Sequence, residues 1–122
     1  MSDAFITYEL DGPVALIGLN RPDKRNAIND ALIVELNAAV QRAHEDAHVI
    51  VLHGHGPNFC AGLDLAEALA RATGKITPPR KRRRHNWHTV FDQIARGPIP
   101  VVAALHGAVV GGGLELATAA HV

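Results

Sequence analysis

The sequence predicts an α/β fold, and three observations support this prediction. Two apolar runs, residues 49–52 and 101–105, have the continuous hydrophobicity of buried strands. Each run leads through a glycine-rich loop into a segment with helical character, and such strand–loop–helix units are typical of α/β proteins. The composition agrees, because 122 residues with 48% hydrophobic and 20% charged side chains suit one globular domain.

The first expected element is a β-hairpin over residues 4–19. Two runs rich in β-branched residues flank Asp11 and Gly12, a dipeptide that favours a tight turn between strands. Pro13 follows at once and makes an ideal two-residue turn at this dipeptide less favourable. The polar residues 20–26 then form a loop.

The second expected element is an amphipathic helix from Asp30 to about His44. Asn29 precedes it as a suitable N-cap, and the negative charge of Asp30 favours the first helical turn. Four apolar residues recur at helical spacing along the segment and predict its buried face: Ile33, Leu36, Val40 and Ala43.

Strands and helices alternate in the rest of the chain. The run 49–52 predicts a strand that is covered on both faces, and residues 65–72 predict a short helix. Residues 101–105 predict a second buried strand, and residues 114–117 are helical in character. Before that second strand lies another amphipathic helix, whose apolar face is marked by Trp87, Val90, Phe91 and Ile94.

The overall charge and the cysteine count exclude several classes of protein. Twelve basic and twelve acidic residues give a formal net charge of zero, which argues against general electrostatic binding to nucleic acid or a membrane. Cys60 is the single cysteine, so the chain holds neither a disulfide framework nor a thiolate zinc cluster. Because we find no signal peptide and no apolar run of about 20 residues, we expect a cytoplasmic protein.

The charge is nevertheless unevenly distributed. Residues 75–88 contain six Lys and Arg and no acid, a local charge of +6, so the remainder carries −6. Pro78, Pro79 and the basic residues 80–84 are expected to interrupt regular structure. The simplest interpretation of 80–84 is a solvated loop that leads into a helix. An attractor for a phosphate-bearing small molecule ranks above a nucleic-acid patch, because only Trp87 supplies an aromatic side chain nearby.

Two glycine-rich loops, residues 54–64 and 107–113, are the first candidates for chemistry. Each follows a predicted strand and enters a helix, so each can point unpaired backbone N–H groups at an anion or oxyanion. Neither matches a phosphate-binding motif, since Phe59 stands in the place of the third glycine of the dinucleotide fingerprint. The alternative is that these glycines only permit tight turns and close packing.

Glu115 is the strongest single candidate for a catalytic residue. It lies between Leu114 and Leu116, two residues after Gly113, in one of the least polar stretches of the chain. A carboxyl group there is expected to be partly desolvated, which raises its pKa toward the range useful for proton transfer. The alternative is a glutamate in the first turn of a helix, stabilised by the helix dipole.

Cys60 and the histidines carry weaker signals. Cys60 follows a loop, where a nucleophile can lie, but a small buried apolar residue is the favoured interpretation. His53 and His55 alternate along a strand end, with His44 and His48 upstream, which is one way to build a metal site. Because no spaced carboxylate or thiolate completes the set, we favour scattered surface imidazoles and predict no metal site.

Three segments carry longer motifs. Residues 19–29 are LNRPDKRNAIN, residues 51–65 are VLHGHGPNFCAGLDL, and residues 100–117 are PVVAALHGAVVGGGLELA. In order and spacing they resemble the segments LNRPxxxNAL(N/S), G.G..F.AG.DL and P.(I/V)AA(I/V).G...GGG.EL(A/C) of the enoyl-CoA hydratase/isomerase (crotonase) superfamily. The resemblance covers essentially the whole chain. It implies a crotonase-like spiral of ββα units.

The resemblance also implies an incomplete domain. Residues 1–122 would be the N-terminal part of a single crotonase-like domain, with its C-terminal part absent. The apolar residues 116–122 agree with this expectation, because they contain no helix cap, no glycine or proline stop and no polar tail. In the complete protein the resemblance implies a homotrimer or a dimer of trimers.

By the same resemblance, the chain would bind an acyl-CoA substrate and stabilise an enolate. The backbone N–H groups of Leu63 and Gly112 would form the oxyanion hole for the thioester carbonyl. Coenzyme A would enter only as part of the substrate, with no other cofactor. The residues implied to lie near the substrate and its CoA part are Arg25, Ala27, Ala61, Asp64 and Leu65.

Glu115 matches the first of two family glutamates that position and deprotonate water. This match favours hydration of a 2-enoyl-CoA, since family isomerases often lack that glutamate. The second glutamate would lie beyond Val122. Alternatives are another crotonase-type reaction (isomerase, decarboxylase or hydrolase), a non-catalytic acyl-CoA- or protein-binding module, and nucleic-acid binding through residues 80–84.

Overall fold

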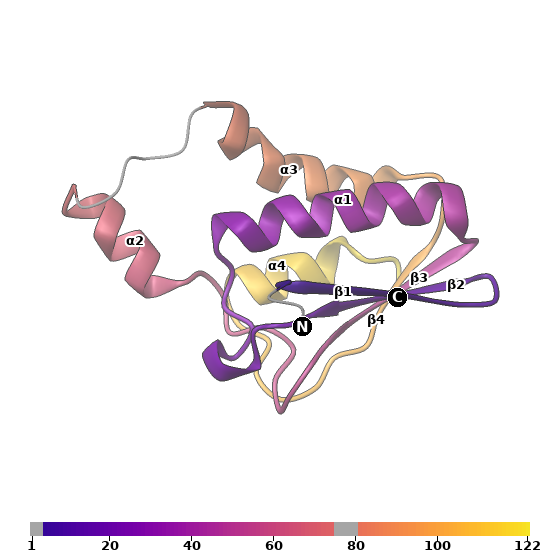
Figure 1. The fold of residues 1–122 in the computed structure, drawn as a ribbon, viewed down its shortest axis with the longest axis horizontal. Helices are drawn as coiled ribbons and strands as arrows, with labels where there is room; N and C mark the ends of the chain where they lie inside the picture. Colours follow the sequence, from indigo (N-terminus) through magenta and orange to yellow (C-terminus); the bar gives the residue numbers. More distant parts are fainter. Residues whose placement is uncertain (1–3, 75–80) are drawn as a thin grey trace.

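The computed structural model describes residues 4–74 and 81–122 (Figure 1). Its strands form one four-stranded mixed sheet in the order β1-β2-β3-β4. β1 and β2 pair antiparallel, whereas β2, β3 and β4 run parallel to one another, so the predicted α/β class is confirmed. The strands are β1 (Ile6–Asp11), β2 (Val14–Leu19), β3 (Val49–Gly54) and β4 (Val101–Ala103).

The hairpin turn lies one residue further along the chain than the sequence predicts. Asp11 pairs with Val14 at the end of the β1–β2 ladder, so Gly12 and Pro13 are the two turn residues. Gly12 has the positive φ (57°) that the first position of such a turn requires. Proline fits the second position of a type II′ turn, where φ is negative, and therefore Pro13 completes the turn instead of disturbing it.

The helices of the described residues follow the predicted segments closely. α1 begins after Asn29, whose side-chain oxygen accepts a hydrogen bond from the backbone N–H of Leu32 (2.8 Å), so the predicted N-cap is confirmed. A short 3-10 turn, η1 (Pro22–Lys24), lies in the polar loop before it. The helices are α1 (Asp30–Asp46), α2 (Leu65–Ala72), α3 (Lys81–Arg96) and α4 (Gly112–Ala119).

Three helices lie on one face of the sheet. α1 connects the parallel strands β2 and β3 and packs against the sheet and alongside α3, and α3 in turn packs against α4. α2 projects away from this layer (Figure 1). None of the helices in the described parts of the chain is both long and apolar enough to cross a membrane.

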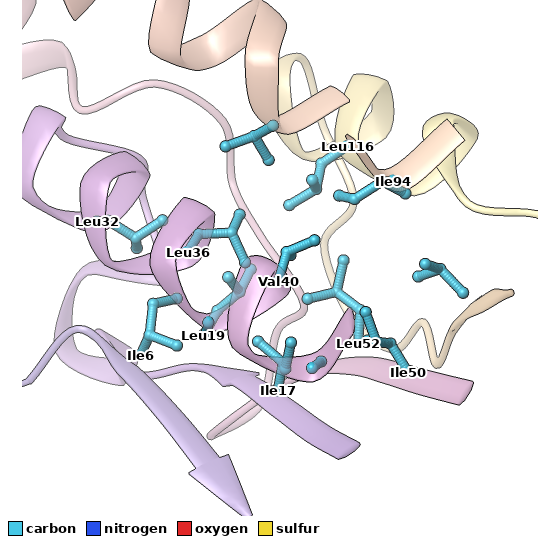
Figure 2. Close-up of a cluster of buried hydrophobic side chains, with 14 of the residues drawn as sticks. Ile6, Ile17, Leu19, Leu32, Leu36, Val40, Ile50, Leu52, Ile94 and Leu116 are labelled. Atoms are coloured by element: carbon cyan, nitrogen blue, oxygen red, sulfur yellow. The ribbon is translucent and has the colours of Figure 1, made fainter. Parts of the chain in front are cut away.

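The hydrophobic core fills the space between the sheet and these helices. Figure 2 shows side chains from all of these elements meeting there. Burying one such aliphatic side chain contributes about 1.5 to 3 kcal/mol, so this cluster is the main support of the fold. Its labelled members are Ile6, Ile17, Leu19, Leu32, Leu36, Val40, Ile50, Leu52, Ile94 and Leu116.

The apolar strands are less enclosed than the sequence predicts. Ile50 and Leu52 of β3 are buried under α1, but the alternate residues Val49 and Val51 are only half-buried. The helices of the described chain cover one face of the sheet, which leaves the opposite face of β3 open. β4 also ends at Ala103, and Leu105 is exposed.

The basic run 80–84 is also partly different from the expected loop. α3 begins at Lys81, so four of its five residues belong to the helix backbone. Lys and Arg are good helix formers, which explains why the run does not interrupt the helix. Arg80 and the preceding Pro78 and Pro79 lie outside the described residues.

Candidate active site

The two glycine-rich loops lie against each other at one edge of the sheet. Both follow parallel strands, and the carboxyl ends of parallel strands meet at the same edge. A short parallel bridge joins the loops, since the N–H of Cys60 donates to the oxygen of Ala108 and the N–H of Val110 donates to the oxygen of Cys60 (both 3.1 Å). Residues about 50 positions apart in the sequence thus form one structural unit.

Glycine is required where the two loops touch. A Cβ on Gly113 would collide with the backbone oxygen of Cys60. A Cβ on Gly62, which has a positive φ of 98°, would lie 3.1 Å from the oxygen of Val110 and 3.6 Å from the nitrogen of Gly112. The backbones of the two loops therefore approach one another more closely than side chains would allow.

The predicted oxyanion donors, Leu63 and Gly112, lie at this contact. Gly62, which precedes Leu63, lies beside Gly112, the buried first residue of α4. In the described part of the chain, neither the N–H of Leu63 nor that of Gly112 donates a hydrogen bond. The N–H of Gly112 also lies at the positive end of the α4 dipole. Both N–H groups are therefore free of hydrogen bonds within the described chain and belong to the segments that meet at this contact.

The segment with the predicted CoA-binding residues runs alongside the first loop. The N–H of Ala61 donates to the oxygen of Arg25 (3.0 Å), and that of Ile28 to the oxygen of Gly62 (2.7 Å). The N–H of Asp64 then donates to the oxygen of Ile28 (2.8 Å). This ladder fixes the loop against residues 25–28. It brings together Arg25, Ala27, Ala61, Asp64 and Leu65, of which Arg25 and Leu65 are exposed.

An ion pair that the sequence did not indicate reinforces the same contact. Nη1 of Arg21 lies 3.1 Å from Oδ2 of Asp64, and their side chains are only 11% and 17% exposed. The same Nη1 donates to the backbone oxygen of Ala27 (2.8 Å). Oδ1 of Asp64 accepts from the N–H of Glu67 at the start of α2 (3.1 Å). Chiefly that backbone hydrogen bond, aided by Arg21, lowers the pKa of Asp64.

Glu115 does not have the desolvated environment that the sequence predicts. It lies in the first turn of α4, and its residue is exposed in the chain as described. Leu116 and the glycines at the start of α4 face the core, and a helix turns about 100° per residue, so the adjacent Glu115 faces outward. Its position one turn into α4 is that of a carboxylate near a helix N-terminus.

Cys60 is a buried residue between the loops. Its Sγ donates a hydrogen bond to the backbone oxygen of Asn26 (3.2 Å), and burial raises the pKa of its thiol. A protonated, fully buried thiol is a poor nucleophile, so the structure favours a packing role for Cys60, which is also what the sequence predicts.

The histidines near the loops lie on the open face of the sheet. The rings of His53 and His55 meet edge to face with their centroids 5.1 Å apart, and Nε2 of His55 lies 2.7 Å from Oγ1 of Thr7. Burial, followed by the nearby His55 and His106, lowers the pKa of His53. Over residues 4–74 and 81–122, no group of three or more His, Cys, Asp and Glu side chains is arranged to hold a metal ion.

The fold and this site define an α/β protein in which two glycine-rich loops meet at one edge of a mixed sheet. In a comparison with known proteins, the family model "Enoyl-CoA hydratase/isomerase" matches residues 9–122. The chain therefore belongs to the enoyl-CoA hydratase/isomerase family, as the motifs suggested. Proteins of this family bind acyl-CoA substrates.

Individual relatives include more than one activity. The chain is 42% identical over 119 residues to a probable enoyl-CoA hydratase of Mycobacterium tuberculosis, covering 96% of this chain and 45% of that protein. It is 37% identical to a 4-chlorobenzoyl coenzyme A dehalogenase of an Arthrobacter species, covering 97% and 44%.

The chain is also similar to a solved structure of the same family. The crystal structure of a protein described as an enoyl-CoA hydratase from Rhodopseudomonas palustris superposes with a TM-score of 0.80 at 43% identity, covering 96% of this chain and 44% of that one. The chain thus spans about half the length of the relatives that it matches.

Proposed function

We propose that this chain provides the oxyanion site and one catalytic carboxylate of an enzyme that hydrates 2-enoyl-CoA thioesters. The observation that carries the proposal is the pair of unpaired N–H groups, Leu63 and Gly112, where the two loops converge. Backbone donors held in a fixed position stabilise the charge that develops on a thioester oxygen, and losing one such donor costs about 3 kcal/mol.

The proposed reaction uses Glu115 as the base that activates water. Its carboxylate accepts a proton from water while the water oxygen bonds to C3 of the substrate. The electrons of the C2–C3 double bond move toward the thioester oxygen, where the N–H groups of Leu63 and Gly112 stabilise the enolate. C2 then takes a proton, and the 3-hydroxyacyl-CoA forms. General acid–base chemistry needs a second group for that proton, which the remainder of a longer protein would supply.

The CoA part of the substrate would lie along the ladder between residues 25–28 and 61–64. The exposed guanidinium of Arg25 is suited to pair with a phosphate group, because its planar fork matches phosphate oxygens. Ala27, Ala61 and Asp64 would form the wall beside it, and the exposed Leu65 would meet apolar parts of the thioester. In this proposal coenzyme A is the only cofactor-like group, and the complete protein is a cytoplasmic homotrimer or dimer of trimers.

The substitution Glu115→Gln in the complete polypeptide tests the proposal. We expect turnover of a short 2-enoyl-CoA to fall by about 10² to 10⁴-fold, because the amide cannot accept the proton. Calorimetry should give an unchanged Kd for the thioester, since the oxyanion donors belong to the backbone. Unchanged turnover would remove Glu115 from this role. Tight thioester binding by the unaltered protein with no turnover would instead favour a binding module.

A second reaction class is favoured by one specific observation. The identity of 37% to a 4-chlorobenzoyl coenzyme A dehalogenase means that a chain this similar can belong to an enzyme with different chemistry. Enolate-like intermediates share the need for an oxyanion hole, whereas side chains around it select the reaction. Turnover of 4-chlorobenzoyl-CoA with release of chloride, and not of a 2-enoyl-CoA, would favour this alternative.

A further inference from the structure

Asn26 is a fully buried polar residue in the loop that lies against the first glycine-rich loop. Among the residues that the structure describes, Asn26 is the one polar residue that is buried, with an exposed fraction of 0%. Its backbone is left-handed (φ 57°), a conformation that asparagine tolerates better than most residues. Burying an amide side chain costs folding free energy unless its hydrogen bonds are satisfied.

Both ends of the Asn26 side chain are hydrogen-bonded. Its Oδ1 accepts from the backbone N–H of Arg21 (2.7 Å). Its Nδ2 donates to two backbone oxygens, those of His55 (3.0 Å) and Asn58 (2.8 Å). One amide thus connects the loop that follows the hairpin to both ends of the turn at residues 55–58.

The main chain of Asn26 adds two more connections. Its N–H donates to the oxygen of Arg21 (2.8 Å), and its oxygen accepts from Sγ of Cys60 (3.2 Å). Packing around the amide is tight, because a Cβ on Gly54 would lie 2.9 Å from Nδ2 of Asn26. The amide therefore has little freedom to move, and neither does the backbone that it holds.

These contacts lie at the beginning of the ladder that leads to Leu63. The ladder starts where Ala61 bonds to Arg25 and continues to the bond between Ile28 and Gly62. Asn26 fixes the turn at residues 55–58 before this ladder, and the ladder then sets the position of the Leu63 N–H. A shift of the turn would move that N–H relative to Gly112, and misplacement by about 1 Å costs on the order of 10²-fold in rate.

We propose that Asn26 is a positioning residue that holds the first loop in the register required for the Leu63 N–H to bind a thioester oxygen. The inference rests on the proposed function, because it assigns Leu63 to the oxyanion hole. Asn26 itself is buried and touches no substrate in this assignment.

The test is Asn26→Asp in the complete polypeptide, read by the infrared stretch of a bound thioester carbonyl. The substitution keeps the shape and the acceptor for Arg21, but turns the donated bonds toward His55 and Asn58 into contacts between oxygens. The probe is butanoyl-CoA labelled with ¹³C at the thioester carbonyl, which has no double bond to hydrate. Hydrogen bonds from the oxyanion hole lower its stretching frequency. We expect the variant to lose most of that shift, and kcat for a 2-enoyl-CoA to fall about 10²-fold.

A matched control separates positioning from general destabilisation. Leu36→Ala removes a buried side chain of α1 in the core, on an element that does not contribute to either loop. At a temperature where both variants are folded, the control should keep the full carbonyl shift and the wild-type kcat. If Asn26→Asp does not fold, Asn26→Gly, which fits the left-handed backbone, replaces it.

Each remaining outcome decides the inference. An unchanged carbonyl shift in the Asn26 variant, or an equal loss in Leu36→Ala, overturns it. A wild-type protein that shifts the carbonyl but hydrates no 2-enoyl-CoA contradicts the proposed reaction and leaves the positioning role standing. A wild-type protein that binds the probe without any shift overturns the oxyanion assignment and the positioning role together.

Discussion

The two glycine-rich loops are held in place in different ways. Loop 54–64 is fastened to residues 21–28 by the Asn26 amide, by the Arg21–Asp64 ion pair and by a backbone ladder. Loop 107–113 is fastened mainly to the first loop. Within the described chain, Ala108 bonds to the Asn58 side chain and to Cys60, and Val110 bonds to Cys60.

This difference implies an order of dependence. The first loop has its own support from outside the site, and the second loop takes its position from the first. A change that loosens residues 21–28 should therefore disturb both proposed oxyanion donors, Leu63 and Gly112. A change confined to the second loop should disturb Gly112 alone.

Removing the ion pair should give the largest effect. Arg21→Ala removes the cation from Oδ2 of Asp64 and the donor from the oxygen of Ala27 in a mostly buried setting, and leaves the carboxylate with its backbone hydrogen bond from Glu67. We expect the free energy of unfolding to fall by about 2 to 3 kcal/mol, measured by urea denaturation. Amide hydrogen exchange should become faster in both loops, at the N–H of Asp64 and at that of Val110.

The control for this variant is Arg96→Ala. Arg96 pairs with Asp92 on the surface of α3, where the side chains are 83% and 65% exposed. Because water screens such a pair, its loss should cost no more than about 0.5 kcal/mol. An equal loss in Arg21→Ala and Arg96→Ala would show that the first loop does not depend on its ion pair.

Gly54→Ala should give the next largest effect. The added Cβ would lie 2.7 Å from the oxygen of Phe59 and 2.9 Å from both the oxygen of Asn58 and Nδ2 of Asn26. Backbone atoms must move to accept it, which costs about 2 kcal/mol by thermal or urea unfolding. Acyl-CoA binding should also weaken, because a shift of the backbone at Gly54 would displace the ladder between residues 25–28 and 61–64. An unchanged free energy of unfolding in Gly54→Ala would mean that the backbone around the turn can move to accept a Cβ at little cost.

Gly111→Ala should give a smaller and more local effect. Gly111 has a positive φ of 54°, but a Cβ there would meet no atom within 4 Å. The cost is therefore backbone strain alone, about 1 to 2 kcal/mol. Hydrogen exchange should become faster at Val110 and Gly113 and stay unchanged at Asp64. Faster exchange at Asp64 would contradict the proposed order of dependence.

Acidification should give the smallest effect on stability. It acts through His53, which lies near the end of β3 just before the first loop. The pKa of His53 is lowered by burial and by His55 and His106, and only Glu9 opposes this shift. The folded protein therefore binds the His53 proton more weakly than the unfolded chain. The contribution of neutral His53 to the free energy of unfolding is therefore complete above the ordinary histidine pKa of about 6.5. This contribution is lost as the pH falls through the lower folded-state value. Urea midpoints across this range should fall less steeply in His53→Asn. Parallel pH profiles would exclude His53 as the cause.

Local signals allowed most of the fold to be predicted from the sequence. Asn29 as an N-cap and the apolar spacing after it define α1, and the predicted helix 65–72 has the observed bounds of α2. The predicted position of the hairpin turn was wrong by one residue. The dipeptide Asp11-Gly12 is itself a common turn sequence, whereas the turn is formed by Gly12 and Pro13. In each case the information lies within a few residues.

The supports of the site could not be predicted in this way. Arg21 and Asp64 are 43 residues apart, and neither is flanked by a pattern that indicates burial. Asn26 lies in a polar loop, where the tendency of asparagine toward positive φ is its only local signal. The exposure of Glu115 depends on which helix face packs on the core, which the short apolar stretch around it does not specify.

The order in which the loops support each other is also the order in which they are synthesised. Residues 21–28 leave the ribosome first, loop 54–64 follows, and loop 107–113 then meets loop 54–64. Each part of the site therefore bonds mainly to segments that are synthesised before it. The first proposed donor, Leu63, thus takes most of its support from residues that precede it in the chain, and the bonds from Phe59 to His106 and from Cys60 to Ala108 are added last.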